Sequence, residues 1–158
     1  MQYAVKDGVR TLRFDGELLS TSSSRIGSRP RWVEFSLYRT PKGVYIISRV
    51  GSSRYYHNSQ CSVVSRNRLS AVEDIELATD AMPCPECRPS LADIEGVFPE
   101  TPRYWAQSSE KARGIIASLM KYDENGTEYL TNVARRLLED AAEVDEGISE
   151  AFYNDFIE

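Results

Sequence analysis

The chain contains very little histidine and cysteine, with one histidine and three cysteines in 158 residues. Three cysteines cannot all pair with one another, so disulfides within the chain would leave one thiol over. If the single histidine binds a metal, no imidazole is left for a Ser-His or Cys-His catalytic pair. The chain also lacks a glycine loop of either common phosphate-binding type. We therefore assign no catalytic residue, and an enzyme that uses carboxylates alone stays an open alternative.

Long hydrophobic runs are also lacking. No segment approaches the roughly 20 apolar residues that a membrane-spanning helix requires. Residues 1–11 do not have the pattern of a secretory signal peptide. Low cysteine use agrees with a compartment in which thiols stay reduced. With 41% hydrophobic and 27% charged residues, the composition predicts a compact cytoplasmic protein without a membrane partner.

The histidine and the cysteines that are present form one pattern, His57-x3-Cys61 followed by Cys84-x2-Cys87. Two short-spaced pairs separated by a loop are typical of tetrahedral zinc sites, so we predict a Cys3His site for Zn²⁺. Because all four ligands are protein side chains, the metal would be structural. The alternatives are a buried free cysteine with a Cys-x2-Cys redox pair, or disulfides. Prolines prevent regular helix around the second pair, at Pro83, Pro85 and Pro89.

Residues 55–90 resemble the Ada-like metal-binding module, in which a His-x3-Cys or Cys-x3-Cys pair precedes a Glu- and Ala-rich helix and a Pro-Cys-x2-Cys-Arg-Pro knuckle. The matching pieces are Tyr56-His57, Cys61, Glu76-Leu77-Ala78, Pro83-Cys84 and Cys87-Arg88-Pro89. The resemblance implies a zinc scaffold for this segment. In DNA-repair members the first ligand is a cysteine that accepts a methyl group, and an imidazole cannot act as that thiolate. A DNA-repair-type enzyme is therefore the weakest alternative.

Charge is distributed unevenly along the chain. Residues 1–90 contain 13 basic and 9 acidic residues, whereas residues 91–158 contain 6 and 15. This asymmetry suggests two surfaces with different partners, or one half packed on the other. We accordingly predict a β-rich domain over residues 1–96, which includes the zinc module, and an acidic helical region over residues 97–158.

The first half predicts antiparallel strands. Residues 11–14 alternate in polarity, and we expect a turn near Asp15-Gly16 that leads into residues 17–20. Residues 31–40 and 44–50 are rich in β-branched and aromatic residues, and the turn between them has Gly43 in the left-handed position. Both faces of this hairpin are partly apolar, so we expect both to be covered. Residues 21–30 are polar and predict a loop.

The second half predicts helices. Ser70 and Glu73 form a capping box for a helix that ends near Ala81 inside the zinc module. Residues 96–107 contain two prolines and predict a connector. Beyond it, apolar residues recur at helical spacing in three stripes, the second of which we expect Thr127 to cap. The stripes are Ile115, Ile116, Leu119 and Met120; Leu130, Val133, Leu137, Leu138 and Ala141; and Ile148, Phe152, Phe156 and Ile157.

Arginines near aromatic residues suggest a nucleic-acid surface, on which guanidinium groups contact phosphates and rings stack on bases. The candidates are Arg25, Arg29, Arg31, Arg54, Arg66, Arg68 and Arg88. The alternative is a solvated rim of arginines around ordinary strand residues. The pI of about 5.1 is far below the value of roughly 9 expected of a dedicated nucleic-acid domain.

The sequence therefore predicts an α+β protein with an N-terminal antiparallel sheet, a central Cys3His module and C-terminal helices. The predicted role is non-enzymatic: a zinc-stabilised surface that binds nucleic acid or a protein. The alternative is a bacterial or phage regulator that inhibits a host protein through its acidic C-terminal helices.

Overall fold

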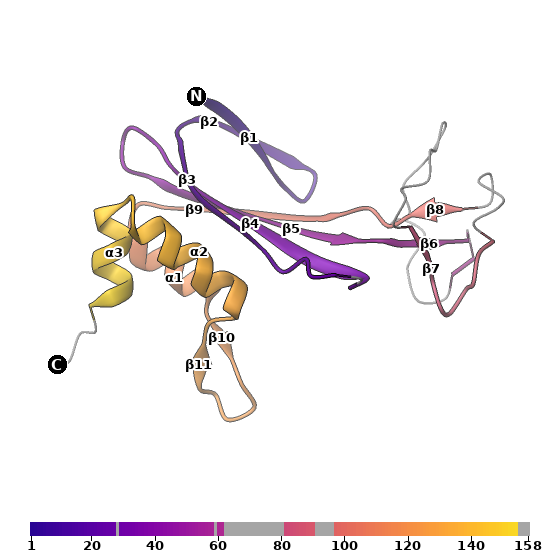
Figure 1. Ribbon diagram of the computed structural model, residues 1–158. Helices are drawn as coiled ribbons and strands as arrows, with labels where there is room; N and C mark the ends of the chain where they lie inside the picture. The colour runs from indigo at the N-terminus through magenta and orange to yellow at the C-terminus, as the bar shows by residue number, and fades with distance from the viewer. Residues whose placement is uncertain (28, 59, 62–80, 91–96, 155–158) are drawn as a thin grey trace. The chain divides into compact units, whose positions relative to one another are not determined.

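The computed structural model describes residues 1–27, 29–58, 60–61, 81–90 and 97–154 (Figure 1). The chain forms two compact units. Unit 1 comprises residues 1–24, 34–50 and 104–158, and unit 2 comprises residues 25–33 and 51–103. The predicted division into residues 1–96 and 97–158 stays a prediction about which parts fold independently.

Strands and helices are both present in unit 1, whereas the strands of unit 2 are short. Unit 1 contains β1 (Gln2–Asp7), β2 (Arg10–Asp15), β3 (Glu17–Ser23), α1 (Ala112–Leu119), β10 (Lys121–Tyr122), β11 (Glu128–Tyr129), α2 (Asn132–Ala142) and α3 (Glu146–Tyr153). Three strands have residues in both units: β4 (Arg31–Arg39), β5 (Tyr45–Ser53) and β9 (Arg103–Ser109). Unit 2 contains β6 (Tyr55–His57), β7 (Met82–Pro83) and β8 (Phe98–Pro99). The predicted α+β class, with antiparallel strands before C-terminal helices, is confirmed.

The largest sheet has the strand order β3-β4-β5-β9. The turn between β4 and β5 forms as predicted: Gly43 has φ +86°, and the Thr40 amide donates to the Val44 carbonyl at 2.9 Å. A left-handed φ at this position favours glycine because a Cβ would meet the backbone.

β3 begins directly after the predicted turn at Asp15-Gly16, but β2 and β3 lie in different sheets, so the two segments do not form the expected hairpin. β2 pairs with β1, joined by a tight turn in which Gly8 has φ +61°, and β3 pairs with β4. A two-residue turn that has glycine at its first position matches the twist of paired strands, so it favours the earlier hairpin. β3 also extends to Ser23, which shortens the predicted loop over residues 21–30.

The predicted connector over residues 96–107 is also wrong in its second part. From Arg103 onward the chain forms β9, which lies beside β5 in the four-stranded sheet. The two prolines of this stretch, Pro99 and Pro102, precede β9, so every residue of the strand keeps its backbone N–H for pairing. Sequence distance concealed the partner strand, because β5 lies about fifty residues earlier.

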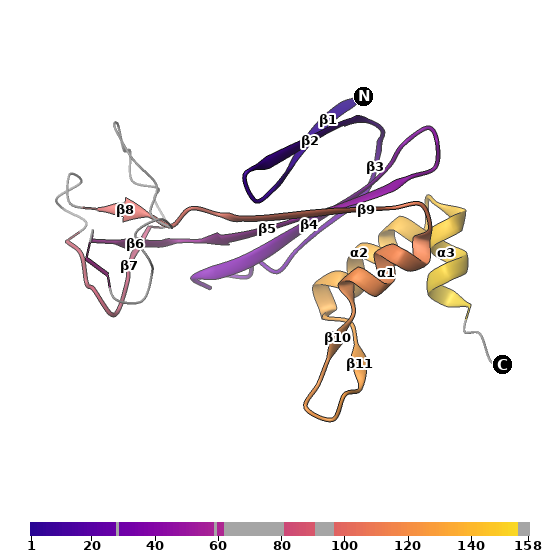
Figure 2. The ribbon, with the colours of Figure 1, turned by 180° about the vertical axis from the view of Figure 1, so that it is seen from behind.

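Both faces of the sheet in unit 1 are covered, as predicted. On one face Tyr38, Ile46 and Ala106 pack with Val5 of β1, and three partly buried residues complete this cluster: Tyr3, Leu12 and Phe14. The helices cover the other face, where the Ser20 hydroxyl donates to the Leu137 carbonyl at 2.8 Å. Figures 1 and 2 show the β1–β2 hairpin and the helices on opposite sides of the sheet.

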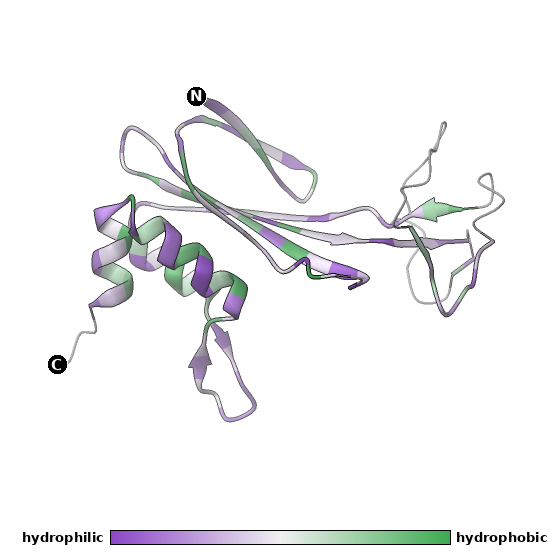
Figure 3. Ribbon diagram, in the orientation of Figure 1, coloured by the Kyte–Doolittle hydropathy of each residue, from purple (hydrophilic) through white to green (hydrophobic). Residues whose placement is uncertain are grey.

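The C-terminal stripes form helices whose apolar sides are core. The largest completely buried side chains of unit 1 are Leu37, Ile47, Ile115, Leu137, Leu138 and Ile148. Figure 3 shows the hydrophilic colour of the β10–β11 strands that separate α1 from α2. Thr127 lies in the turn of that hairpin, and Thr131 caps α2 instead by accepting from the Ala134 amide at 3.3 Å. The predicted cap at Thr127 is therefore wrong, because the helix begins four residues later in the chain.

Several predictions fall outside the described residues. They are the helix with the Ser70 and Glu73 capping box, the arginines Arg66 and Arg68, and the apolar residues Phe156 and Ile157. Among the helices of the described part, none is long and apolar enough to cross a membrane.

Candidate metal centre

The predicted ligands are brought together by a small sheet in unit 2. β6 pairs in parallel with β7 and antiparallel with β8, so the sheet has the order β7-β6-β8. His57 is the last residue of β6, and Cys84 directly follows β7. The Cys84 amide donates to the Tyr56 carbonyl at 3.0 Å, which extends the β6–β7 pairing to the first residue of the Cys-x2-Cys pair.

A tight turn presents Cys84 and Cys87 on one side. The Arg88 amide donates to the Cys84 carbonyl at 2.8 Å, and Arg88 has φ +47°, an uncommon conformation for a residue with a Cβ. Asn58 ties this turn to β6: its amide donates to the Cys87 Sγ at 3.4 Å, and its side-chain Nδ2 donates to the Cys87 carbonyl at 3.1 Å. The Cys61 amide donates to the Asn58 carbonyl at 3.3 Å, which returns Cys61 toward the same point.

The ligand atoms of His57, Cys61, Cys84 and Cys87 all lie within 4.8 Å of one another. The Cys61 and Cys84 Sγ atoms are 4.0 Å apart, and the Cys87 Sγ is 3.9 Å from the His57 Nδ1. A tetrahedral site with metal–sulfur bonds of about 2.3 Å has sulfur–sulfur edges of about 3.8 Å, whereas a disulfide bond requires about 2.05 Å. The four residues therefore have the spacing of metal ligands, and the disulfide alternative does not fit the described cysteines.

The other nitrogen of the His57 ring faces a carboxylate. Its Nε2 lies 2.7 Å from the Glu100 Oε1, and the Arg31 Nη2 donates to the same oxygen at 2.5 Å. An ionised carboxylate only accepts hydrogen bonds, so Nε2 carries the hydrogen and Nδ1 presents its lone pair to the cysteines. Sequence reasoning missed Glu100, because 43 residues separate it from His57 and only the β6–β8 pairing brings them together.

The pKa values of the groups on the two sides of His57 are shifted in opposite directions. Burial raises the pKa of the Cys87 thiol to about 11, and hydrogen bonds with the other two thiols add to this, while the Asn58 amide opposes it. A bound cation reverses such a shift, because a coordinated thiol loses its proton. Burial would also raise the pKa of Glu100, but hydrogen bonds from Arg31 and His57, together with the charge of Arg31, hold it below its usual value.

The predicted nucleic-acid arginines that the structure describes all belong to unit 2. The guanidinium groups of Arg25 and Arg54 lie 4.5 and 5.5 Å from the centre of the Trp32 ring. Arg31 lies 5.4 Å from the centre of the Tyr55 ring, in addition to its bond with Glu100. Two further arginines are exposed, Arg29 and Arg88. Their role in binding stays a prediction.

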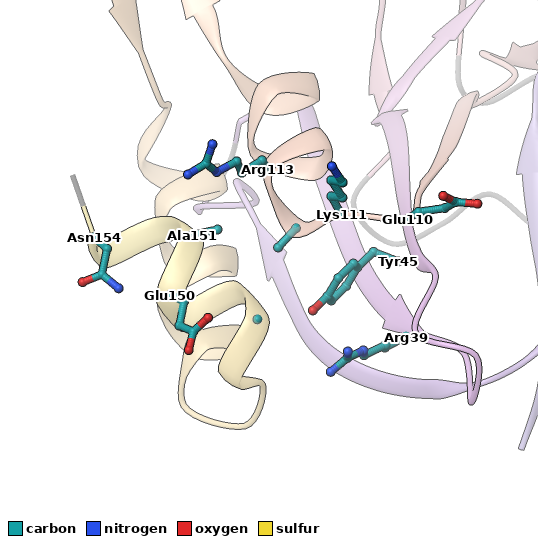
Figure 4. A pocket seen from close by; sticks show the side chains of 10 residues that line it. Arg39, Tyr45, Glu110, Lys111, Arg113, Glu150, Ala151 and Asn154 are labelled. Atoms are coloured by element: carbon teal, nitrogen blue, oxygen red, sulfur yellow. The ribbon is translucent and has the colours of Figure 1, made fainter. Parts of the chain in front are cut away.

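Unit 1 contains a cavity of about 410 Å³ between α3, the start of α1 and the β4–β5 hairpin (Figure 4). Figure 4 shows Tyr45 and Arg39 on the hairpin side and Glu150 on α3. Side chains of both charges line it: Arg39, Lys111, Arg113, Glu110 and Glu150.

The hydrogen-bonding groups beside this cavity hold unit 1 together. Asp145 accepts from the Tyr45 hydroxyl and the Arg39 Nη1, each at 2.6 Å, and from the Ile148 amide at 2.9 Å, which caps α3. Burial would raise the pKa of Asp145, but these three donors hold it below its usual value. The arrangement is that of a structural cap, so we assign no reaction to this cavity.

Comparison with known protein families, with curated proteins and with solved structures finds no match to this chain. The Ada-like resemblance of residues 55–90 therefore stays a prediction, supported by the clustering of its four expected ligands. The candidate metal centre rests on its own geometry.

Proposed function

We propose that unit 2 is a zinc-structured binding module that engages single-stranded nucleic acid. The observation that carries the metal assignment is the cluster of three thiols and one imidazole within 4.8 Å. Soft thiolate ligands in a tetrahedral set favour zinc over magnesium or calcium. With four protein ligands no coordination position is open to a substrate, so the bound ion would supply folding energy and no chemistry of its own.

The composition of unit 2 supports a nucleic-acid partner. All of its basic residues are arginines, and the four lysines of the chain lie in unit 1. Arginine stacks on planar groups and contacts phosphate with two parallel hydrogen bonds, which lysine cannot do. The guanidinium groups over Trp32 and Tyr55 are planar surfaces on which unpaired bases can stack. Such stacking requires unpaired bases, so we propose a single strand as the ligand.

Fluorescence anisotropy with a labelled single-stranded oligonucleotide tests this proposal. We expect the affinity to fall as salt rises, with a slope of about −0.7 per phosphate contact. The double variant Arg25→Ala/Arg29→Ala should bind more weakly and, if each arginine contacts one phosphate, reduce the magnitude of that slope by about 1.4.

The matched control is Arg13→Ala/Arg135→Ala, which removes the same charge from exposed positions of unit 1. Equal losses in both double variants would show that net charge alone attracts the oligonucleotide. Absence of binding by the zinc-loaded wild type would contradict the nucleic-acid proposal while leaving the metal assignment intact.

A second candidate function is inhibition of a host protein through the acidic helices. The exposed carboxylates of this region support it: Glu139, Asp140, Glu143, Glu146 and Glu150. The apolar sides of these helices are largely core, so the exposed carboxylates form much of the surface that they present. Removal of residues 97–158 would delete β9 and much of the core, so charge reversal at Glu139 and Glu143 is the better test. Loss of a captured basic partner by that variant, with oligonucleotide binding absent, would favour this candidate.

A DNA-repair enzyme remains the weakest candidate. His57 occupies the position at which the repair members have their reactive cysteine, and its Nδ1 faces the cysteine cluster. An assay for methyl transfer from a methylated phosphate backbone to the protein, followed by mass spectrometry, would detect that activity. We expect no gain of 14 Da on any cysteine of the zinc-loaded protein.

A further inference from the structure

A single carboxylate oxygen joins the candidate metal centre to the arginine surface of unit 2. The Glu100 Oε1 accepts from the His57 Nε2 at 2.7 Å and from the Arg31 Nη2 at 2.5 Å. The His57 side chain is completely buried, the Glu100 side chain is 9% exposed and the Arg31 side chain is 54% exposed. Glu100 therefore connects the buried ligand His57 to the partly exposed Arg31.

Backbone pairing between β6 and β8 places this acid beside His57. His57 pairs with Phe98 and Tyr56 pairs with Pro99 across β6 and β8, which sets Glu100 at the end of the ladder. A buried carboxylate is costly unless it is paired, and here both of its partners are donors. Because a buried ion pair adds little net stability, the effect that we assign to Glu100 is the orientation of its two donors.

We infer that Glu100 is a positioning residue, which holds the His57 ring with Nδ1 toward the metal and anchors Arg31 beside Tyr55. Metal-binding histidines commonly donate their second ring N–H to a carboxylate, which fixes the tautomer and the ring orientation. This inference rests on the proposed zinc site. Because His57 and Arg31 share one oxygen of Glu100, we expect binding of the metal to affect the position of Arg31.

Competition with a chromophoric zinc chelator measures the effect on the full-length protein. We expect Glu100→Ala to weaken zinc binding about 10- to 100-fold. Glu100→Gln retains an oxygen that can accept from His57, so its loss should be smaller. If Glu100→Ala does not fold, Glu100→Gln still has to bind zinc more weakly than the wild type.

Glu86→Gln is the matched control, because Glu86 is an exposed carboxylate between Cys84 and Cys87. This variant removes one negative charge near the same ion without touching His57. Equal weakening by Glu86→Gln and Glu100→Gln would overturn the inference, since charge alone would then explain the effect.

A second measurement follows the ring itself. The chain has one histidine, so every imidazole nitrogen signal in a ¹⁵N NMR spectrum belongs to His57. In the zinc-loaded wild type we expect a metal-bound Nδ1 and an Nε2 proton that exchanges slowly, and Glu100→Ala or Glu100→Gln should speed that exchange. A metal-bound Nε2 in the wild type would overturn the inference. A wild type that holds no zinc at all would instead refute the proposed function beneath it.

Discussion

The buried side chains of the two units differ in kind. Unit 1 buries aliphatic residues from a sheet and three helices, including Leu37, Ile115 and Leu138. In the described part of unit 2 the buried residues are His57, Cys84 and Val97, and two of these are candidate metal ligands. Small cores supply little hydrophobic stabilisation, and a structural metal commonly replaces it. We therefore expect packing to stabilise unit 1, and a metal bound by the four clustered residues to stabilise unit 2.

Metal removal should produce the largest difference in stability between the two units. Each unit contains one tryptophan, Trp32 in unit 2 and Trp105 in unit 1. In Trp105→Phe, chelation should shift the emission of Trp32 to longer wavelength, because metal-binding energy in such modules is folding energy, of the order of 10 kcal/mol. In Trp32→Phe, the emission of Trp105 should stay unchanged. A change in neither variant would show that no metal stabilises unit 2.

Among the polar contacts of unit 1, the largest mutational effect should come from Asp145, whose carboxylate accepts from two side chains and one amide. Asp145→Asn keeps an oxygen for the α3 cap but loses the charge that Arg39 contacts. We expect a loss of about 2 kcal/mol in the free energy of unfolding, measured with urea. Asp140→Asn, at an exposed position of α2, should change it by less than about 0.5 kcal/mol. Zinc stoichiometry should not change in either variant.

Gly147→Ala tests how closely β5 approaches α3. A Cβ at Gly147 would collide with the Tyr45 hydroxyl, which Asp145 holds in place. Alanine is normally favoured over glycine in a helix by about 1 kcal/mol, yet here we expect destabilisation by about 1 to 2 kcal/mol. The double variant Tyr45→Phe/Gly147→Ala should recover part of the loss. Stabilisation by Gly147→Ala alone would show that the two elements lie farther apart.

The smallest effect near neutral pH concerns Tyr45. Burial, followed by its bond to Asp145, raises the pKa of Tyr45 to about 12 from a usual value of 10. The folded state then binds the phenolic proton more tightly than the unfolded state, so stability is retained below pH 10 and falls as pH rises from 10 toward 12. Urea unfolding of Trp32→Phe, in which Trp105 reports on unit 1 alone, should show this decline. Adding Tyr45→Phe should reduce the slope, and an unchanged slope would contradict the assignment.

Local patterns accounted for much of what the structure contains. The spacing of His57, Cys61, Cys84 and Cys87 predicted their clustering, because short-spaced ligand pairs are recognisable without knowledge of the fold. The apolar stripe of α2 predicted a buried face, since Val133, Leu137 and Ala141 recur at helical spacing. The two strand errors had different causes. β9 joins β5, which is nonlocal in sequence, whereas β2 joins β1 through the adjacent turn at Gly8 and the sequence reasoning chose the wrong one of two neighbouring turns.

The sequence by itself determined the ligand set, the α+β class and the apolar faces, because each depends on residues a few positions apart. Only the tertiary structure decided that Glu100 lies against His57 and that Asp145 joins Arg39 to Tyr45. These contacts connect residues 43 to 106 positions apart. The physical reason is that a buried carboxylate is stable only with hydrogen-bond donors around it, and strand pairing and helix packing bring those donors together.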